Sequence, residues 1–358
     1  MNKNIISDEL LHNNESATEN FKFPYEIKKL DSEANMKILQ LFTGEKTGFV
    51  QVGPKNYFLP IQYESSAESI YNFKVRPDDV WIVTYPRSGT TWTLEMVWLL
   101  EHNHDYDTAM KSFLFERCPY LETTIHGHPD VINKINKHNN VSKQNKNILE
   151  QMFIPNWTIL EKQTGKRIIK THLPFSLLPP DLLTSGCKVV YVARNPKNAM
   201  LSYFHFSKLY ALMGYNGDLE QYMNLFMEDS VTFSPYWSHV EEAWKLRHSE
   251  NLLFMLYEDM SKDLRQSIKK VANFLEKKLT EEQLEKLDNH LQFDNFRNNP
   301  MVNYKCLEDV GIMKKHMGGF MRNRNVPPSK DNANAEMFKK FDEWVEINST
   351  KFNIHFDV

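Results

Sequence analysis

The stretch from residue 80 to residue 92 gathers side chains that could hold an anion. Five apolar or β-branched residues, Val80 to Thr84, predict a short buried strand, and helical spacing begins at Thr90 after a turn. A strand, a tight glycine-containing loop and a helix N-terminus direct free N–H groups and the positive end of the helix dipole at one point. The residues that would meet there are Arg87, Ser88, Gly89, Thr90 and Thr91. The sequence therefore predicts a phosphate or sulfate site, against the alternative of an ordinary N-cap in a βα turn.

This loop differs from the standard nucleotide-triphosphate loop, G-x-x-x-x-G-K-[ST], in which the Lys reaches the outer phosphates and the hydroxyl holds Mg²⁺. Thr90 stands where that Lys belongs, and Thr84 occupies the place of the first Gly. The nearby cation, Arg87, comes before the Gly instead of after it. A metal-dependent small-molecule kinase is therefore disfavoured.

Further cations and a histidine follow two more expected strands. Lys170 and His172 lie at the end of the strand expected over 167–172, and Arg194 follows the apolar strand expected over 187–193. Strands and helices alternate along the chain, which predicts an α/β fold with a parallel sheet. Ligands of such sheets bind at the carboxyl ends of the strands, so we expect these side chains to converge with Arg87.

Other elements follow from periodicity and turn residues. A small β-ribbon is expected over 48–60, a strand over 251–257, and helices over 236–247, 261–277 and 280–289. At Asn195-Pro196, the Asn can cap a helix and the Pro suits its first position.

Composition bounds the function class. The 358 residues are 41% hydrophobic and carry a net charge of −3, which argues against a nucleic-acid binder driven by bulk charge. The three cysteines show neither a disulfide framework nor metal-ligand spacing, and we interpret the pairs His102/His104 and His126/His128 as solvated loop histidines, so no metal is expected. There is no apolar signal core and no apolar run of 18 residues. The sequence predicts a soluble, cytoplasmic protein without a membrane span.

The chain is expected to form one domain over 21–358, preceded by a poorly ordered polar tail over 1–20. Within the domain, the stretch 126–165 changes character, because ten of the fifteen residues from 133 to 147 are Asn or Lys. We interpret this stretch as a mobile insertion beside the site.

Five segments of the chain resemble, in order, the signatures of cytosolic sulfotransferases. They are Tyr85–Trp92, Lys170–Pro174, Val189–Lys197, Tyr257–Met260 and Asn298–Tyr304. The resemblance extends from about residue 23 to the end of the chain. Arg87 in place of the more usual Lys, with the Pro24-Tyr25-Glu26 region, is most similar to the insect branch that includes retinol dehydratase.

The resemblance implies transfer of a sulfuryl group from 3′-phosphoadenosine 5′-phosphosulfate (PAPS) to a hydroxyl or amine, without a metal, leaving 3′,5′-bisphosphoadenosine (PAP). Residues Arg87 to Thr91 would hold the 5′-phosphosulfate, and Trp92, Tyr257 and Phe293 would surround the adenine. Arg194 and Ser202 would bind the 3′-phosphate. His172 suits the general base, and Lys170 and Arg87 would stabilise the charge that builds on the leaving phosphate and the sulfuryl oxygens.

The chain departs from the family pattern near its C-terminus. The family loop over the 3′-phosphate reads Arg-Lys-Gly-x-x-Gly-x-x-Lys, whereas this chain keeps Arg322 and Lys330 but has Asn323, Arg324 and Pro327 at the other three fixed positions. Gly lets the backbone approach a phosphate closely and adopt positive φ, which Arg allows poorly and Pro does not allow. We assign Arg322 and Arg324 to cofactor binding, with Arg324 replacing the lost charge. The family's dimerisation segment is not recognisable in residues 330–340, which leaves a homodimer open.

Two functions follow. The leading one is a small-molecule sulfotransferase acting on an apolar alcohol, phenol or sterol-like compound. The alternative is a catalytically weakened nucleotide- or ligand-binding paralogue, because the loop 322–330 is altered. Candidates for the acceptor pocket are Phe113, Phe115, Phe153, Trp157, Phe175, Phe206, Tyr210 and Met213.

Overall fold

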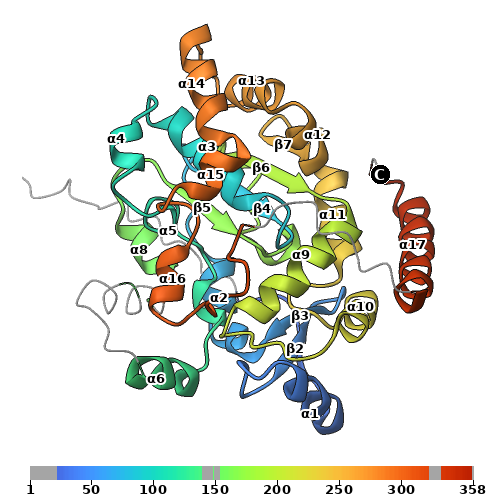
Figure 1. The fold of residues 1–358 in the computed structure, drawn as a ribbon. Coiled ribbons are helices and arrows are strands. Elements are labelled where there is room, and N and C mark those ends of the chain that lie inside the picture. Colours follow the sequence, from blue (N-terminus) through green and yellow to red (C-terminus); the bar gives the residue numbers. More distant parts are fainter. Residues whose placement is uncertain (1–21, 139–147, 149–153, 322–331, 357–358) are drawn as a thin grey trace, which may run out of the picture.

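A four-stranded parallel sheet lies at the centre of the chain (Figure 1). The computed structural model describes residues 22–138, 148, 154–321 and 332–356. The strands run in the order β5-β4-β6-β7 and are β4 (Val80–Thr84), β5 (Ile168–Thr171), β6 (Lys188–Ala193) and β7 (Leu252–Leu256). A parallel sheet has both faces covered, and accordingly all of β4 is buried. The predicted α/β fold with a parallel sheet is confirmed.

Successive residues of the central strands serve opposite faces of the sheet. Trp81 and Val83 of β4 belong to the core on one face, together with Tyr191 of β6. Val80 and Ile82 belong to the core on the other face, where α3, α13 and α14 pack. Each strand therefore joins two apolar clusters, and its carboxyl end is left at the edge between them.

A second, antiparallel sheet is formed by β1 (Ile27–Lys29), β2 (Phe49–Val52) and β3 (Tyr57–Pro60). The β2–β3 hairpin coincides with the ribbon that turn residues predict over 48–60. Its main chain reaches the rest of the core, because Phe58 exchanges backbone hydrogen bonds with Phe233 and Ser234.

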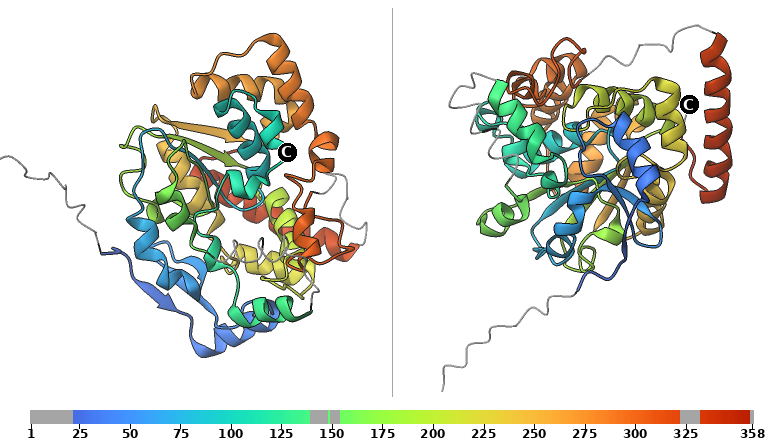
Figure 2. Two further views of the ribbon diagram at one scale, coloured as in Figure 1. Left: turned by 90° about the vertical axis from the view of Figure 1, so that its left-hand side faces the viewer. Right: turned by 90° about the horizontal axis from the view of Figure 1, so that it is seen from below.

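Helices cover both faces of the central sheet (Figures 1 and 2). Their bounds are α1 Ser32–Leu41, η1 Ile61–Ser65, α2 Ala67–Tyr71, α3 Thr90–Glu101, α4 Tyr106–Ala109, α5 Leu114–Arg117, η2 Thr123–Ile125, α6 Pro129–His138, α8 Asn156–Lys162, η3 Phe175–Leu177, α9 Pro196–Leu209, α10 Leu219–Met227, α11 Tyr236–Leu246, α12 Tyr257–Lys262, α13 Leu264–Phe274, α14 Glu281–Leu291, α15 Phe293–Asn298, α16 Lys305–Asp309 and α17 Asn332–Phe352. Asn195 caps α9 by accepting from the N–H groups of Lys197 and Asn198, as predicted. The helix expected over 261–277 begins instead at Leu264, because the Asp263 carboxylate accepts from the N–H of Gln266 and starts a new helix.

Helix α17 stands at the edge of the molecule beside α9, α10 and α11 (Figure 2). It is attached by aromatic side chains: Phe341 is fully buried, and Trp344 and Phe352 pack on Trp237 of α11 with ring centroids 5.9 and 6.1 Å apart. The Lys197 ammonium adds an ion pair with Asp342 at 2.7 Å. The end of the chain is thus docked on the side of the sheet that α9 and α11 cover.

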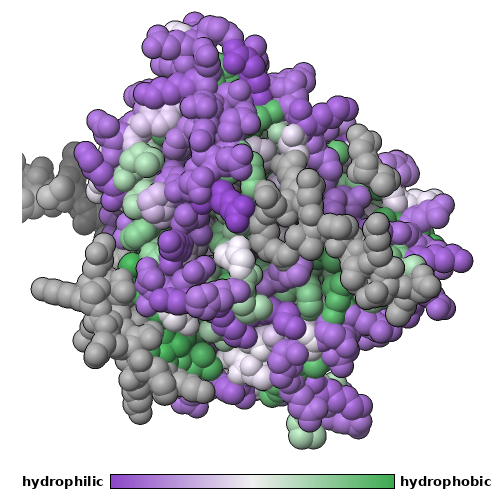
Figure 3. Space-filling view, viewed as in Figure 1, coloured by the Kyte–Doolittle hydropathy of each residue, from purple (hydrophilic) through white to green (hydrophobic). Residues whose placement is uncertain are grey.

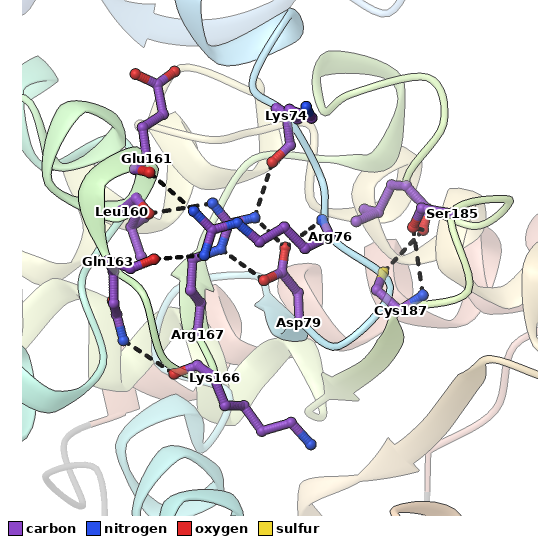
Figure 4. A network of polar contacts seen from close by, with 11 residues as sticks. Lys74, Arg76, Asp79, Leu160, Glu161, Gln163, Lys166, Arg167, Ser185 and Cys187 are labelled. Carbon is purple, nitrogen blue, oxygen red and sulfur yellow. Dashed lines mark hydrogen bonds and ion pairs between the residues drawn. The ribbon is translucent and has the colours of Figure 1, made fainter.

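A buried ion pair fixes the amino ends of β4 and β5 (Figure 4). The Arg167 guanidinium, 1% exposed, donates from Nε and Nη2 to the two carboxylate oxygens of Asp79, the first at 2.7 Å. It also donates to the carbonyl oxygens of Lys74 at 2.9 Å and Leu160 at 3.3 Å. Because both charges are out of water and satisfied, this pair locks the register of the two strands at the end opposite the predicted site.

The face seen in Figure 3 is largely hydrophilic where the described residues show, with hydrophobic side chains in small areas. None of the described helices combines the length and the apolar composition needed to cross a bilayer. Among the described residues there is likewise no group of three or more His, Cys, Asp or Glu side chains placed to hold a metal ion. The predicted tail 1–20 lies outside the described residues, as does part of the predicted insertion 126–165, whose described parts include α6 and α8.

Candidate active site

The loop between β4 and α3 lies where the sequence predicts an anion site. Gly89 has φ +97° and Arg87 has φ +68°, so the backbone turns sharply before α3 begins at Thr90. A Cβ on Gly89 would lie 2.7 Å from Cδ2 of Tyr257, so no side chain fits there. The Ser88 side chain is fully buried beneath the loop, and its Oγ has no hydrogen-bond partner among the described residues. The loop is therefore a narrow cradle, and the Ser88 hydroxyl in it has no hydrogen-bond partner among the described residues.

Arg87 is held in place from four sides. Its Nε donates to Ser202 Oγ at 3.1 Å and its Nη2 to the Phe320 carbonyl at 2.9 Å. The guanidinium carbon lies 4.4 Å from the ring centroid of Phe320 and 5.1 Å from that of Phe206. Burial, followed by repulsion from Arg194, lowers the pKa of Arg87 to about 10, which leaves it charged at neutral pH.

Aromatic and basic side chains line the wall beside this loop. The rings of Trp92 and Tyr257 lie 6.0 Å apart, and the Trp92 indole N–H donates to the Leu291 carbonyl at 2.8 Å. The Arg194 guanidinium lies over Tyr257 at 4.2 Å and donates to the Arg87 carbonyl at 2.8 Å. This wall is continued by Phe293. A π-rich wall, whose Trp92 and Tyr257 rings are tilted by 59° to one another, beside two guanidinium groups suits a base and its phosphates.

His172 follows the end of β5 and has a defined tautomer. Its Nδ1 lies 2.8 Å from the Thr84 carbonyl oxygen, which can only accept, so Nδ1 carries the proton. Its Nε2 is then left with a lone pair, and His172 lines the cavity described below. Burial, and then the charge of Lys170, hold the pKa of His172 well below its usual range. The imidazole is therefore neutral and able to accept a proton.

Lys170 lies two residues earlier on β5, with its ammonium 4.1 Å from the Tyr120 ring centroid. Burial lowers the pKa of Lys170 to about 8, while the Glu122 carboxylate opposes that effect. The ammonium thus remains mostly charged at neutral pH, next to the neutral imidazole of His172.

A single cavity of about 860 Å³ brings the predicted site residues together. The predicted residues that line it are Arg87, Gly89, Thr90, Thr91, Trp92, Lys170, His172, Arg194, Ser202, Tyr257 and Phe293. Ser88 lies behind the loop instead of in the wall. Arg322 and Arg324 lie outside the described residues.

Much of the cavity wall is apolar and aromatic, and the rings of Tyr120 and Phe233 pack on His172. Of the predicted acceptor-pocket residues, Phe115, Phe206, Tyr210 and Met213 line the cavity. Phe113, Trp157 and Phe175 instead pack against the core, and Phe153 lies outside the described residues. Ile154 and Ile159, which are 42% and 39% exposed, line the cavity as well and extend its apolar surface to solvent.

The interpretation of His126 as a solvated loop histidine is wrong. Its side chain lines the cavity, 3.3 Å from the Tyr120 hydroxyl, with its ring 5.7 Å from that of Phe233. Burial lowers the pKa of His126 to about 3, so it is neutral. The sequence reasoning also missed Glu122 and His239, whose side chains contact the His172 main chain. Nothing in their local sequence distinguishes them from ordinary buried polar residues.

The chain is similar to known sulfotransferases over most of its length. A family described as "Sulfotransferase domain" matches residues 77–353. Luciferin sulfotransferase of Photinus pyralis is 32% identical over 305 residues, covering 83% of this chain and 79% of that protein. Sulfotransferase 1B1 of Canis lupus familiaris is 33% identical over 280 residues, covering 78% of this chain and 86% of that protein.

Two crystal structures of retinol dehydratase share the fold. The structure in complex with androsterone and the inactive cofactor PAP has 34% identity and a TM-score of 0.84, and it covers 94% of this chain and 99% of that one. The structure in a complex with retinol and PAP has 34% identity and a TM-score of 0.83, with coverage of 94% and 100%. These similarities bear out the predicted likeness to the branch that includes retinol dehydratase.

Proposed function

The chain belongs to the cytosolic sulfotransferase family, and we propose that it transfers a sulfuryl group from PAPS to the hydroxyl of a small apolar acceptor, with His172 as the general base. PAPS is the donor of this family, and PAP is bound in the retinol dehydratase structures. The observation that carries the proposal is the cavity, because Arg87, Gly89, Thr90 and Thr91 of the loop line the same space as Lys170 and His172, within a largely apolar wall.

The described residues fit the donor. The cradle around Gly89 excludes a Cβ, Ser88 Oγ is a buried hydroxyl without a partner among the described residues, and guanidinium groups flank the loop. We assign Arg87 to Thr91 to the 5′-phosphosulfate, and Arg194 and Ser202 to the 3′-phosphate. The adenine is assigned to the wall of Trp92, Tyr257 and Phe293. Arg322 and Arg324, which lie outside the described residues, are assigned to the 3′-phosphate as part of the same proposal.

His172 acts on the acceptor. The hydrogen bond from Nδ1–H to the Thr84 carbonyl fixes the ring so that Nε2 can receive the proton of the acceptor hydroxyl. As that proton leaves, the acceptor oxygen forms its bond to sulfur, and the bond between sulfur and the phosphate oxygen breaks. The nearby Lys170 ammonium and Arg87 guanidinium are placed to stabilise the charge that builds on the departing phosphate and the sulfuryl oxygens.

The aromatic part of the cavity wall selects the acceptor class. Its rings and methyl groups favour a flat or elongated apolar molecule, and His126 and Tyr120 offer limited polar contact. Retinol and androsterone, bound in the two similar structures, are both compounds of this kind. We therefore propose an apolar alcohol, phenol or sterol-like acceptor. Elimination of the sulfated product would follow only for an acceptor whose sulfate leaves readily.

Two measurements test the proposal. Calorimetric titration with PAP, without added metal, is expected to show one tight site. A transfer assay with labelled PAPS against a panel of apolar alcohols, phenols and sterols is expected to give product, with His172→Ala slowing kcat by about 100-fold or more. His248→Ala, at an exposed histidine away from the cavity, is the matched control and is expected to match the parent. Full turnover by His172→Ala would refute the assigned base.

The alternative of a weakened binding paralogue is decided by the same two measurements. Folded protein that binds no PAP, or that binds PAP without any transfer, would favour a ligand-binding role. The altered loop 322–330 would then explain the loss of cofactor binding or of catalysis. A homodimer stays an open expectation.

A further inference from the structure

One buried hydroxyl joins the loop between β4 and α3 to His172. Thr84 is the last residue of β4, follows four apolar residues and is fully buried. Its Oγ1 lies 3.1 Å from Nδ1 of His172 and 2.7 Å from Oγ1 of Thr90, the first residue of α3. A valine would fill the same volume in this strand without a polar group to desolvate, so the hydroxyl calls for a reason.

The direction of these hydrogen bonds follows from what each atom can do. Nδ1 of His172 carries a proton, because it lies 2.8 Å from the carbonyl oxygen of Thr84, so the ring can only donate to the Thr84 hydroxyl oxygen. The hydroxyl proton of Thr84 is then left for Thr90 Oγ1, its remaining partner among the described residues. The series therefore runs from Nδ1–H of His172 to Thr84 Oγ1, and from the Thr84 O–H to Thr90 Oγ1.

The far end of this series faces the cavity, because Thr90 lines it. Since Thr90 Oγ1 accepts from Thr84, its own proton is available to an anion in the cradle, beside the N–H groups at the start of α3. The 5′-phosphosulfate of PAPS is assigned to this place. Buried hydrogen bonds in series polarise one another, so an anion that accepts from Thr90 also strengthens the bond from Nδ1–H of His172 to Thr84.

A stronger hydrogen bond at Nδ1 acts on the opposite nitrogen of the ring. An imidazole that donates more strongly from Nδ1 holds more electron density at Nε2 and accepts a proton there more readily. Burial, and then the charge of Lys170, hold the pKa of His172 well below its usual range, so this ring is a weak base without such support. The hydroxyl of Thr84 is placed to supply that support when the cradle is occupied.

We propose that Thr84 is a positioning residue of the active site: its hydroxyl links Thr90 in the cradle to Nδ1 of His172, so that bound PAPS fixes the imidazole and makes Nε2 a better base. No proton travels along the series. This inference rests on the proposed function, because that function assigns PAPS to the cradle and the general base to His172. Thr84 does not line the cavity and is not expected to touch either substrate.

Three variants separate this role from a structural one. Thr84→Val removes the hydroxyl at constant volume, and Thr84→Ser keeps the hydroxyl. The matched control is Thr93→Val. Thr93 is also fully buried and lies in the same helix as Thr90, but its hydroxyl donates to the Gly89 carbonyl at 3.1 Å. Thr93→Val therefore removes a hydroxyl next to the same loop without removing a contact to His172.

The first test follows His172 by NMR in the full chain, with ¹⁵N-labelled histidine and the signal assigned by its loss in His172→Gln. Saturation with PAP, whose 5′-phosphate stands in for that of PAPS, is expected to shift the Nδ1–H signal of the parent protein downfield. Thr84→Ser and Thr93→Val should keep this shift, whereas Thr84→Val should lose at least about half of it. An equal shift in Thr84→Val would overturn the inference, because the phosphate would then act on the ring through space alone.

The second test separates kcat from KM in the transfer assay. Thr84→Val is expected to lower kcat by about tenfold, the effect of one lost hydrogen bond, with the KM for PAPS within about twofold of the parent value. Thr84→Ser should restore kcat. A raised KM with an unchanged kcat would overturn the inference, because Thr84 would then serve binding alone.

The outcomes distinguish this inference from the proposed function. Parent protein that binds PAP but transfers no sulfuryl group would refute the proposed function, and the NMR response would still decide the role of Thr84. Parent protein that binds no PAP would overturn both. If Thr84→Val does not fold, Thr84→Ala carries the same test. A parent Nδ1–H signal that saturating PAP leaves unmoved would overturn the inference by itself.

Discussion

Replacing Gly89 by Ala tests the geometry on which the donor site depends. The residue combines φ +97°, which an L-residue adopts only with strain, and a Cβ position 2.7 Å from Cδ2 and 3.3 Å from Cε2 of Tyr257. The backbone term costs about 1–2 kcal/mol. The ring must also move, and Tyr257 is packed between Trp92 and Arg194, so it cannot yield without disturbing the wall assigned to the adenine.

The magnitude follows from what that wall contributes. Stacking of a base on an aromatic side chain is worth about 1–3 kcal/mol, and each 1.4 kcal/mol is about a tenfold change in Kd. Gly89→Ala should therefore weaken PAP binding by about 10- to 100-fold and lower the free energy of unfolding by about 1–2 kcal/mol. Isothermal titration with PAP and chemical denaturation measure the two quantities.

The matched control is Gly165→Ala. Gly165 is not among the glycines with positive φ, and a Cβ there would meet no atom within 4 Å. The Gly165→Ala substitution should leave both the PAP affinity and the free energy of unfolding near those of the parent protein. Parent-like PAP binding by Gly89→Ala would refute the reasoning, because it would mean that the ring of Tyr257 and the turn at Gly89 do not shape the nucleotide site.

Three further predictions concern charges at different places in the fold. Arg87→Lys keeps a cation but loses the hydrogen bonds to Ser202 and the Phe320 carbonyl and the stacking on the Phe320 ring. We expect kcat/KM in a transfer assay to fall by at least about tenfold. Parent-like kinetics would contradict the role assigned to Arg87. The pKa of Lys170 is lowered to about 8, so its ammonium is charged below that pH and neutral above it. If this charge is needed, kcat/KM should decline as the pH rises through about 8. A flat profile from about pH 7 to 9.5 would exclude Lys170 as a required cation. Arg167→Met leaves the Asp79 carboxylate buried and unpaired and should cost about 3–5 kcal/mol of unfolding free energy in urea, whereas Lys37→Met, at an exposed helix pair, should cost nothing measurable.

The sequence by itself determined the sheet and the end of it where ligands bind. Apolar runs over 80–84 and 187–193 could be satisfied only by burial on both faces, and that requirement produced β4 and β6 of a parallel sheet. Arg87 and Arg194 follow those runs, and Lys170 lies at the end of a third expected strand, so their convergence at the carboxyl edge of the sheet was predictable from local order alone. The Asn195 cap was predictable for the same reason, because its partners lie within three residues along the chain.

Only the tertiary structure decided the contacts between residues far apart in the sequence. His126 was predicted to be solvated, yet the packing of Tyr120 and Phe233 places it in the cavity wall. Glu122 lies 50 residues before His172 and His239 lies 67 residues after it, so no periodicity links them. The tautomer of His172 likewise depends on the Thr84 carbonyl, 88 residues away. Local patterns report which face of an element is buried; which atoms meet there, and with what charge, is set by how the elements pack.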